Sequence, residues 1–251
     1  MAAADRGGDS GYTWRIFLQI TLIFLALSHW NYAFLAPVKL MVVLLHEISH
    51  GLMALATGGT VQAIVITPDE TGACRTSGGN DLLIISAGYL GSMFFGGLIL
   101  HCSRSRAHSA GFYALLSLLI FTAAMTVIED DYSRKFAIGV VGVGLVLAMF
   151  CPGILSGLIL RCLGTVSCLY ALIDIYNDTL SQTAHDLGLQ SDASAFAELT
   201  GLSAGAVGLG WLLTSGVYFF VTLKTSLHPD AQGRASDRRE TPRNRRNSHG
   251  G

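Results

Sequence analysis

Long stretches without Asp, Glu, Lys or Arg most constrain how this chain can fold. They cover residues 16–38, 82–100, 107–128, 136–160 and 199–223. A helix needs about 20 apolar residues to cross a hydrocarbon core of about 30 Å, and each stretch is close to or beyond that length. Only 13% of the residues are charged, where a soluble domain has about 25%. The sequence therefore predicts an integral, multi-pass membrane protein.

Prolines divide these stretches into helices. Pro37 separates the first stretch from a second apolar segment over 38–56. Cys151-Pro152-Gly153 divides the fourth stretch into helices over about 136–150 and 154–176. We therefore predict seven transmembrane helices, with six as the alternative count, in an all-α polytopic membrane protein.

A short β-hairpin is predicted after the second apolar helix. Residues 61–67 are rich in β-branched side chains, and 74–76 can form the return strand after a turn-rich segment. An edge strand beside a cleft can bind an extended peptide by strand addition. The alternative is an ordinary hairpin loop.

The two ends of the chain are polar. We predict a disordered N-terminus over 1–13, a membrane-embedded domain over 14–223 and a disordered, arginine-rich tail over 224–251. By the positive-inside rule, the basic tail is expected to lie in the cytoplasm. The net charge of −1 gives no support for nucleic-acid binding. The expected surroundings are a lipid bilayer, while organelle and oligomeric state are left open.

The segment Leu45-His46-Glu47-Ile48-Ser49-His50 places three ionisable side chains inside an apolar helix. Ionisable groups within a membrane span are costly and usually serve a function. On a helix, His46 and His50 project from one face, and two imidazoles at that spacing can hold Zn²⁺. Glu47 is then placed to take a proton from a zinc-bound water. The alternative is a pair of histidines that hydrogen-bond to neighbouring helices.

A catalytic zinc usually has three protein ligands, and Asp174 is the candidate for the third. It directly follows an apolar helical segment, and Asp178 lies four residues further on the same face. Asp174 is expected to bind the metal, with Asp178 as a residue that orients a histidine ring or as the alternative ligand. The alternative for both is that they mark the water-exposed end of a helix.

These motifs resemble those of the site-2 protease clan, in particular its peptidase M50B-like branch. The histidine motif is paired with a Tyr-Ala-x-x-Asp-Ile segment at Tyr170 to Ile175 and an Asp-Ala-x-x-Phe-Ala segment at Asp192 to Ala197. The resemblance covers most of residues 30–223. It implies an intramembrane metalloprotease with His46, His50 and Asp174 as zinc ligands and Glu47 as the base.

The leading hypothesis is therefore an intramembrane zinc metalloendopeptidase that hydrolyses peptide bonds of membrane proteins. Two alternatives remain open at this stage. One is a non-proteolytic membrane scaffold or chaperone that retains a zinc site. The other is a zinc hydrolase of a lipid-like substrate.

Overall fold

The computed structural model describes residues 6–179 and 191–227. Within these residues the chain is almost entirely helical, with one two-stranded sheet. The elements follow in the order α1 (Arg6–Ser28), η1 (Ala33–Leu35), α2 (Ala36–Ala56), β1 (Thr60–Ile66), β2 (Gly72–Ser77), α3 (Asp81–Cys102), α4 (Arg106–Thr126), α5 (Asp131–Phe150), α6 (Gly153–Thr179), α8 (Asp192–Thr200) and α9 (Ala204–Leu227).

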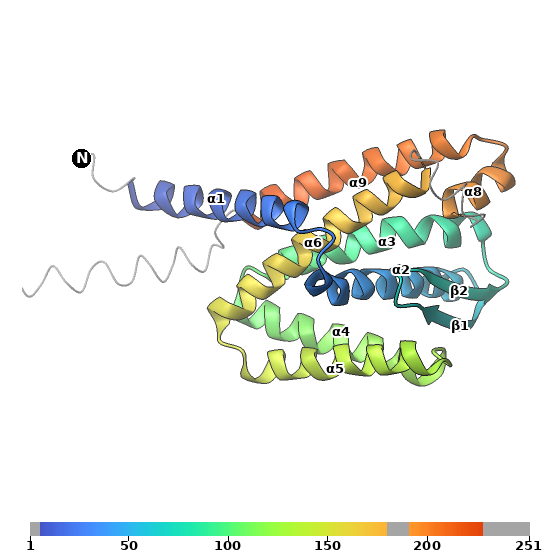
Figure 1. The fold of residues 1–251 in the computed structure, drawn as a ribbon, viewed down its shortest axis with the longest axis horizontal. Coiled ribbons are helices and arrows are strands. Elements are labelled where there is room, and N and C mark those ends of the chain that lie inside the picture. The colour runs from blue at the N-terminus through green and yellow to red at the C-terminus, as the bar shows by residue number, and fades with distance from the viewer. Residues whose placement is uncertain (1–5, 180–190, 228–251) are drawn as a thin grey trace, which may run out of the picture.

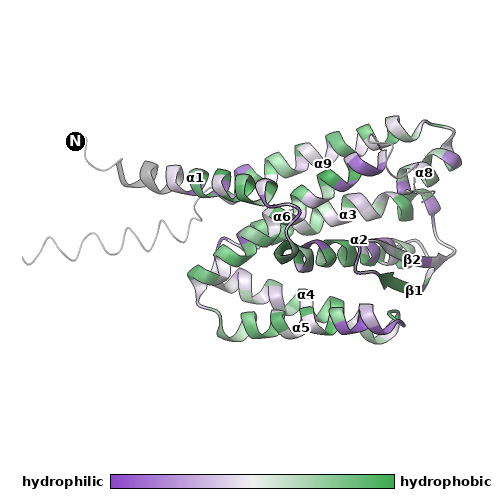
Figure 2. Ribbon diagram, viewed as in Figure 1, coloured by the Kyte–Doolittle hydropathy of each residue, from purple (hydrophilic) through white to green (hydrophobic). Residues whose placement is uncertain are grey.

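Six helices in the described chain are long and apolar enough to cross a membrane. They correspond to α2, α3, α4, α5, α6 and α9, and the apolar part of α1, Thr13–Ser28, is shorter. The predicted all-α membrane fold is thereby confirmed, with six rather than seven full-length spans. Figure 2 shows hydrophobic residues along the bodies of these helices and hydrophilic residues near α8 and at the start of α5.

Helix α3 lies in the middle of the bundle. It packs against α2 and α6, and also against α9, while α4 and α5 pair with each other beside α2 (Figure 1). Glycines allow the close contact of α3 with α6: a Cβ on Gly96 would clash with Cys168, and one on Gly164 would clash with Leu100. Small residues of this kind let membrane helices approach closely. Helices α2 and α6 both pack on α3 and also contact each other.

The break between α1 and α2 occurs before Pro37. Helix α1 ends at Ser28, a turn with η1 follows, and Pro37 lies in the first turn of α2. Proline is well tolerated there because the first helical N–H groups have no partner within the helix. Helices α1 and α2 run in the same direction in Figure 1, and α1 projects beyond the bundle. Helix α1 packs on α6 and α9.

The predicted β-hairpin is present, and its first strand is fastened to the α4–α5 connection. The Ile64 N–H donates to the carbonyl of Val127 at 2.9 Å. The Ile66 N–H donates to the Ser133 hydroxyl at 2.8 Å, and that hydroxyl donates back to the Ile66 carbonyl at 3.0 Å. The outer edge of β1 is therefore already paired.

The turn of the hairpin is tied to α2 by an ion pair. Lys39 Nζ lies 2.6 Å from Glu70 Oε1, and both side chains are largely shielded from solvent. The Lys39 ammonium also lies 5.7 Å from the centre of the Trp30 ring. Together with the bonds of Ile64 and Ile66, this contact fastens the turn end of the hairpin.

A short helix, α8, precedes the last span. Its N-cap is Ser191, whose hydroxyl accepts a hydrogen bond from the N–H of Ser194. It ends at Gly201, whose φ of +75° suits glycine. Residues 180–190, which precede it, lie outside the described chain. Helix α8 packs on α3 and α9, and these contacts hold its first residue near α2, the helix with the histidine motif.

Candidate functional site

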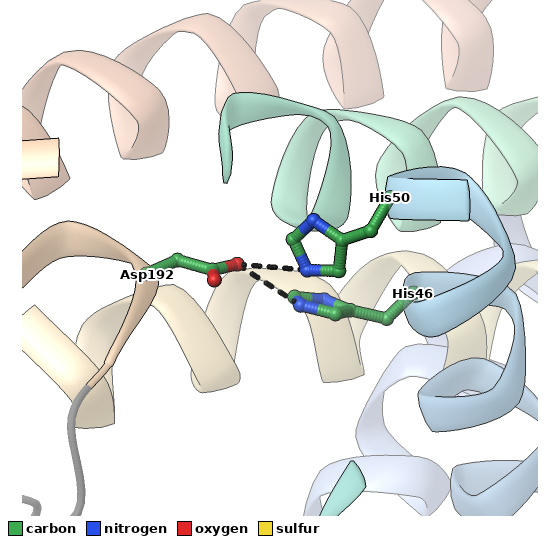
Figure 3. Close-up of side chains that lie close together, drawn as sticks. All are labelled: His46, His50 and Asp192. Atoms are coloured by element: carbon green, nitrogen blue, oxygen red, sulfur yellow. Dashed lines mark hydrogen bonds and ion pairs between the residues drawn. The ribbon is translucent and has the colours of Figure 1, made fainter. Parts of the chain in front are cut away.

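Two histidines of α2 and one aspartate of α8 converge on one point (Figure 3). Asp192 Oδ2 lies 3.1 Å from His46 Nε2 and 3.2 Å from His50 Nε2. The two imidazole centres are 4.8 Å apart, as expected for side chains four residues apart on a helix. One atom from each of the three residues lies within 4.8 Å of the others.

The hydrogen bond made by His50 Nδ1 shows which ring nitrogen carries the proton. The other nitrogen, Nε2, faces Asp192. His50 Nδ1 lies 2.7 Å from the backbone carbonyl of Ile84, which can only accept, so Nδ1 carries a proton. In the neutral ring, Nε2 is then an acceptor and faces a carboxylate oxygen, which is also an acceptor. Two acceptors at 3.2 Å need either a proton, as in the imidazolium, or a metal ion between them.

The donor set fits a zinc ion. Ligand atoms on one tetrahedral zinc, with bonds of about 2.0–2.2 Å, lie about 3.3 Å apart, close to the two Nε2–Oδ2 distances. Two imidazole nitrogens and a carboxylate oxygen are a common set for a catalytic zinc. The carbonyl bond of His50 is also the kind of contact that orients a metal-binding histidine.

Asp192 is held in its charged form. Burial raises the pKa of its carboxyl, but hydrogen bonds to His46 and His50, together with their charge, outweigh burial and bring the pKa below its ordinary value. Asp192 is the first residue of α8, where the helix dipole also favours a negative side chain. An ionised carboxylate is what a metal site needs.

Glu47 lies beside this group but outside it. Its side chain is buried and lines the same cavity as the histidines. Gly72, the first residue of β2, packs directly against the Glu47 carboxylate, where a Cβ would overlap it. The hairpin therefore covers Glu47 because glycine leaves room for the carboxylate.

Asp174 and Asp178 line the cavity without joining the three converging side chains. Asp178 Oδ2 accepts a hydrogen bond from the Tyr89 hydroxyl at 2.5 Å, and the Tyr89 ring meets the His46 ring edge-on at 5.1 Å. Asp178 thus contacts a residue that positions His46. Which carboxylate binds a metal stays a prediction, with Asp174 favoured by the sequence and Asp192 by proximity.

Gly88 of α3 leaves the space that the two imidazoles occupy. A Cβ at this position would overlap His46 Nε2 and both Cε1 and Nε2 of His50. The sequence suggests only a packing role for the small residues of this helix. The contact of Gly88 with the two histidines depends on how α2 and α3 pack, which the sequence does not reveal.

The cavity in front of these residues has a volume of about 880 Å³. Its walls come from α2, α3, α6, α8 and the hairpin, and β2 contributes Gly72, Ala73, Cys74 and Thr76. Burial raises the pKa of the Cys74 thiol to about 12, with a further contribution from the charge of Glu47, so this thiol is protonated at neutral pH. The cavity is large enough for several residues of an extended peptide.

Residues 19–222 match the peptidase M50B-like family. The chain belongs to this family. At the family level it is therefore an intramembrane metalloprotease, as the motifs around His46 and Tyr170 suggested. Searches among curated proteins and among solved structures gave no match. Family membership and six apolar helices together make the lipid bilayer its environment.

Proposed function

We propose that this chain is a zinc-dependent endopeptidase that cleaves membrane-protein substrates within its cavity. The observation that carries the proposal is the convergence of His46, His50 and Asp192 beside Glu47. Family membership supports a peptidase, and this arrangement supports metal-dependent hydrolysis. His46, His50 and Asp192 would hold the ion, with Asp174 as the competing third ligand.

Zinc, when bound, would supply a Lewis acid that makes a water acidic near neutral pH and polarises the substrate carbonyl. Glu47 takes the proton of the attacking water and delivers it to the nitrogen of the departing amine. Its buried position, beneath Gly72, keeps the carboxylate away from bulk solvent. A substrate helix must unwind locally, because helical carbonyls are already hydrogen-bonded.

Strand β2 offers the edge on which an unwound substrate would bind. The outer edge of β1 is bonded to Val127 and Ser133, whereas the described residues provide no backbone partner for the outer edge of β2. Ile64 and Ile66 direct their N–H groups outward, so their partners Cys74 and Gly72 do the same on β2. These two residues line the cavity, which supports substrate binding by strand addition.

Glu47→Gln tests the proposed chemistry. The amide keeps the size of the side chain but cannot take a proton, so zinc content should stay at about one per chain while cleavage falls by about 10²–10⁴-fold. The assay uses purified protein and a panel of labelled single-span peptides, some with glycine pairs at the centre to ease unwinding.

Glu129→Gln is the matched control, because Glu129 is exposed in the α4–α5 connection. Full cleavage by Glu47→Gln would remove Glu47 from the mechanism. Zinc-bound wild-type protein that cleaves none of the peptides would favour the scaffold hypothesis, and release of fatty acid from added phospholipid would favour a lipid hydrolase.

A further inference from the structure

The cavity wall carries a buried phenol to which the chemistry described so far gives no role. Tyr170 of α6 lines the cavity and is only 8% exposed. Among the described residues, the one acceptor for its hydroxyl is the backbone carbonyl of Glu70, at 3.5 Å. Hydrogen bonds between two oxygens usually measure about 2.5–3.0 Å, so this contact is weak. A buried donor with so weak a bond favours a better acceptor when one enters the cavity.

The ring of Tyr170 is held in place by its neighbours. It stacks on Trp30, with ring centres 6.0 Å apart and planes inclined by 29°. It also belongs to the apolar core cluster that includes Val43 and Ile48 of the motif helix α2. These contacts fix the ring, whereas the hydroxyl proton can rotate about its C–O bond to a new acceptor. A donor positioned in advance stabilises developing charge without further rearrangement of the protein.

The hairpin brings this hydroxyl and Glu47 to one short stretch of chain. The Tyr170 hydroxyl contacts the carbonyl of Glu70, and the Glu47 carboxylate packs against Gly72, two residues later. Gly72 also begins the open edge of β2, on which an unwound substrate would bind. A substrate backbone paired with Gly72 therefore lies beside both the proposed base and the phenol.

We propose that the Tyr170 hydroxyl donates a hydrogen bond to the oxygen of the scissile carbonyl and stabilises the negative charge that develops there. This inference rests on the proposed endopeptidase function. As the water oxygen bonds to the carbonyl carbon, the π pair of the C=O bond moves onto the oxygen, and it returns when the C–N bond breaks. Glu47 carries the proton of the water to the departing nitrogen, and Tyr170 keeps its own proton throughout. The bond to a charged oxygen is stronger than the bond to a neutral carbonyl, so the barrier falls.

Tyr170→Phe tests this role because it removes the hydroxyl and keeps the ring. We expect kcat to fall about 10²–10³-fold, as for the loss of one oxyanion donor, with KM within about threefold of the wild-type value and zinc content unchanged. A phosphinic peptide, whose tetrahedral P–O⁻ group resembles the charged carbonyl, should lose affinity by a similar factor. Purified full-length protein and the labelled peptides used for Glu47→Gln serve for both measurements.

Tyr218→Phe in α9 is the matched control. The Tyr218 hydroxyl also donates to a backbone carbonyl over a long distance, that of Phe94 at 3.4 Å, but Tyr218 is not among the residues that line the cavity. This variant should therefore keep the wild-type kcat and the wild-type affinity for the phosphinic peptide.

The outcomes separate the role of Tyr170 from the proposed function. If the wild type cleaves peptides, then an unchanged kcat in Tyr170→Phe, a loss confined to KM, or a loss of zinc would each overturn the role of Tyr170 alone. A zinc-bound wild type that cleaves none of the peptides would instead remove the proposed function, and the role of Tyr170 with it.

Discussion

Asp192 contacts the two histidines across 146 residues of sequence. The local spacing of His46 and His50 is visible in the sequence because four residues make one helical turn. The partner from α8 is not, because nothing in local spacing says which distant acid reaches the pair. One signal was available: Ser191 precedes Asp192 as a helix N-cap does, and a helix start places an acid at a defined point.

The three acids give a direct test of the metal ligands. We expect Asp192→Asn to lose zinc at a chelator concentration more than about 100-fold lower than wild type, because a lost bond costs more than the 10–100-fold typical of an orienting residue. Asp178→Asn should fall within that smaller range, since Asp178 acts through Tyr89. Zinc retention in a graded chelator series at fixed pH provides the measurement.

Asp174→Asn completes the series and decides between the two candidates for third ligand. If Asp174→Asn loses zinc first, the sequence-based assignment holds and Asp192 has another role. If none of the three variants loses zinc, the third ligand lies elsewhere. Wild-type protein without stoichiometric zinc would remove the metal site altogether.

Gly88→Ala should abolish zinc binding without removing any ligand. The added methyl group would overlap the imidazole nitrogens of both His46 and His50, and these rings cannot move away without leaving the common point. Gly142→Ala in α5 is the control, because a Cβ there meets no other atom within 4 Å. Zinc content after purification, with melting temperature as a check on folding, separates the two. Wild-type zinc content in Gly88→Ala would contradict the arrangement of α2 and α3.

At the scale of elements, the long helices and the hairpin could be predicted because each has a strong local pattern. Uncharged stretches of about 20 residues gave the spans, and β-branched residues gave β1. Helix α8 was missed because nine residues with a mixed polar surface carry little periodic signal. The break predicted at Pro37 is present just before it, and Pro37 itself lies in the first turn of α2, where proline is tolerated.

Cys74→Pro tests whether β2 binds the substrate through its open edge. The Cys74 N–H points away from β1, so proline removes a donor to the substrate and leaves the hairpin ladder intact. Cleavage efficiency should fall by about tenfold or more, the effect of about 1.4 kcal/mol, with unchanged zinc content. Steady-state cleavage of a labelled peptide measures this loss.

Cys74→Ala is the control for this variant, since it keeps the N–H and removes only the thiol. Equal cleavage by the proline and alanine variants would mean that the substrate does not pair with β2. Loss of zinc in the proline variant would mean that the hairpin itself had moved.

At the scale of the whole molecule, the predicted basic tail after residue 223 overlaps the last span. Helix α9 continues to Leu227, and the carbonyl of Ser226 accepts a hydrogen bond from the buried Arg161. The sequence predicts the end of the span at Leu223, because the charge of Lys224 is visible in the sequence and the bond between Ser226 and Arg161 is not. Residues 228–251 lie outside the described chain, and their predicted disorder and cytoplasmic position stay predictions.

Truncation after Leu227 should therefore leave zinc content and cleavage unchanged. Truncation after Thr225 should lower the melting temperature, because it removes the acceptor of a buried guanidinium, at a cost of about 1–3 kcal/mol. Thermal unfolding of the two truncated proteins, followed in the same detergent, compares them. Equal stability of the two would show that the Ser226 contact contributes nothing measurable. Loss of cleavage after the truncation at Leu227 would give the tail a role in catalysis.

If a substrate can enter only when the hairpin leaves the cavity, the ion pair between Lys39 and Glu70 limits how often it enters. Separating a shielded pair of this kind costs about 3–5 kcal/mol, which corresponds to an open population of about 0.01–1%. A substrate that waited for this opening would meet a receptive enzyme in fewer than about one encounter in a hundred. Turnover would then be slow whatever the speed of the bond cleavage, and a protease with so rare an opening would spare most of the helices that diffuse past it in the same membrane.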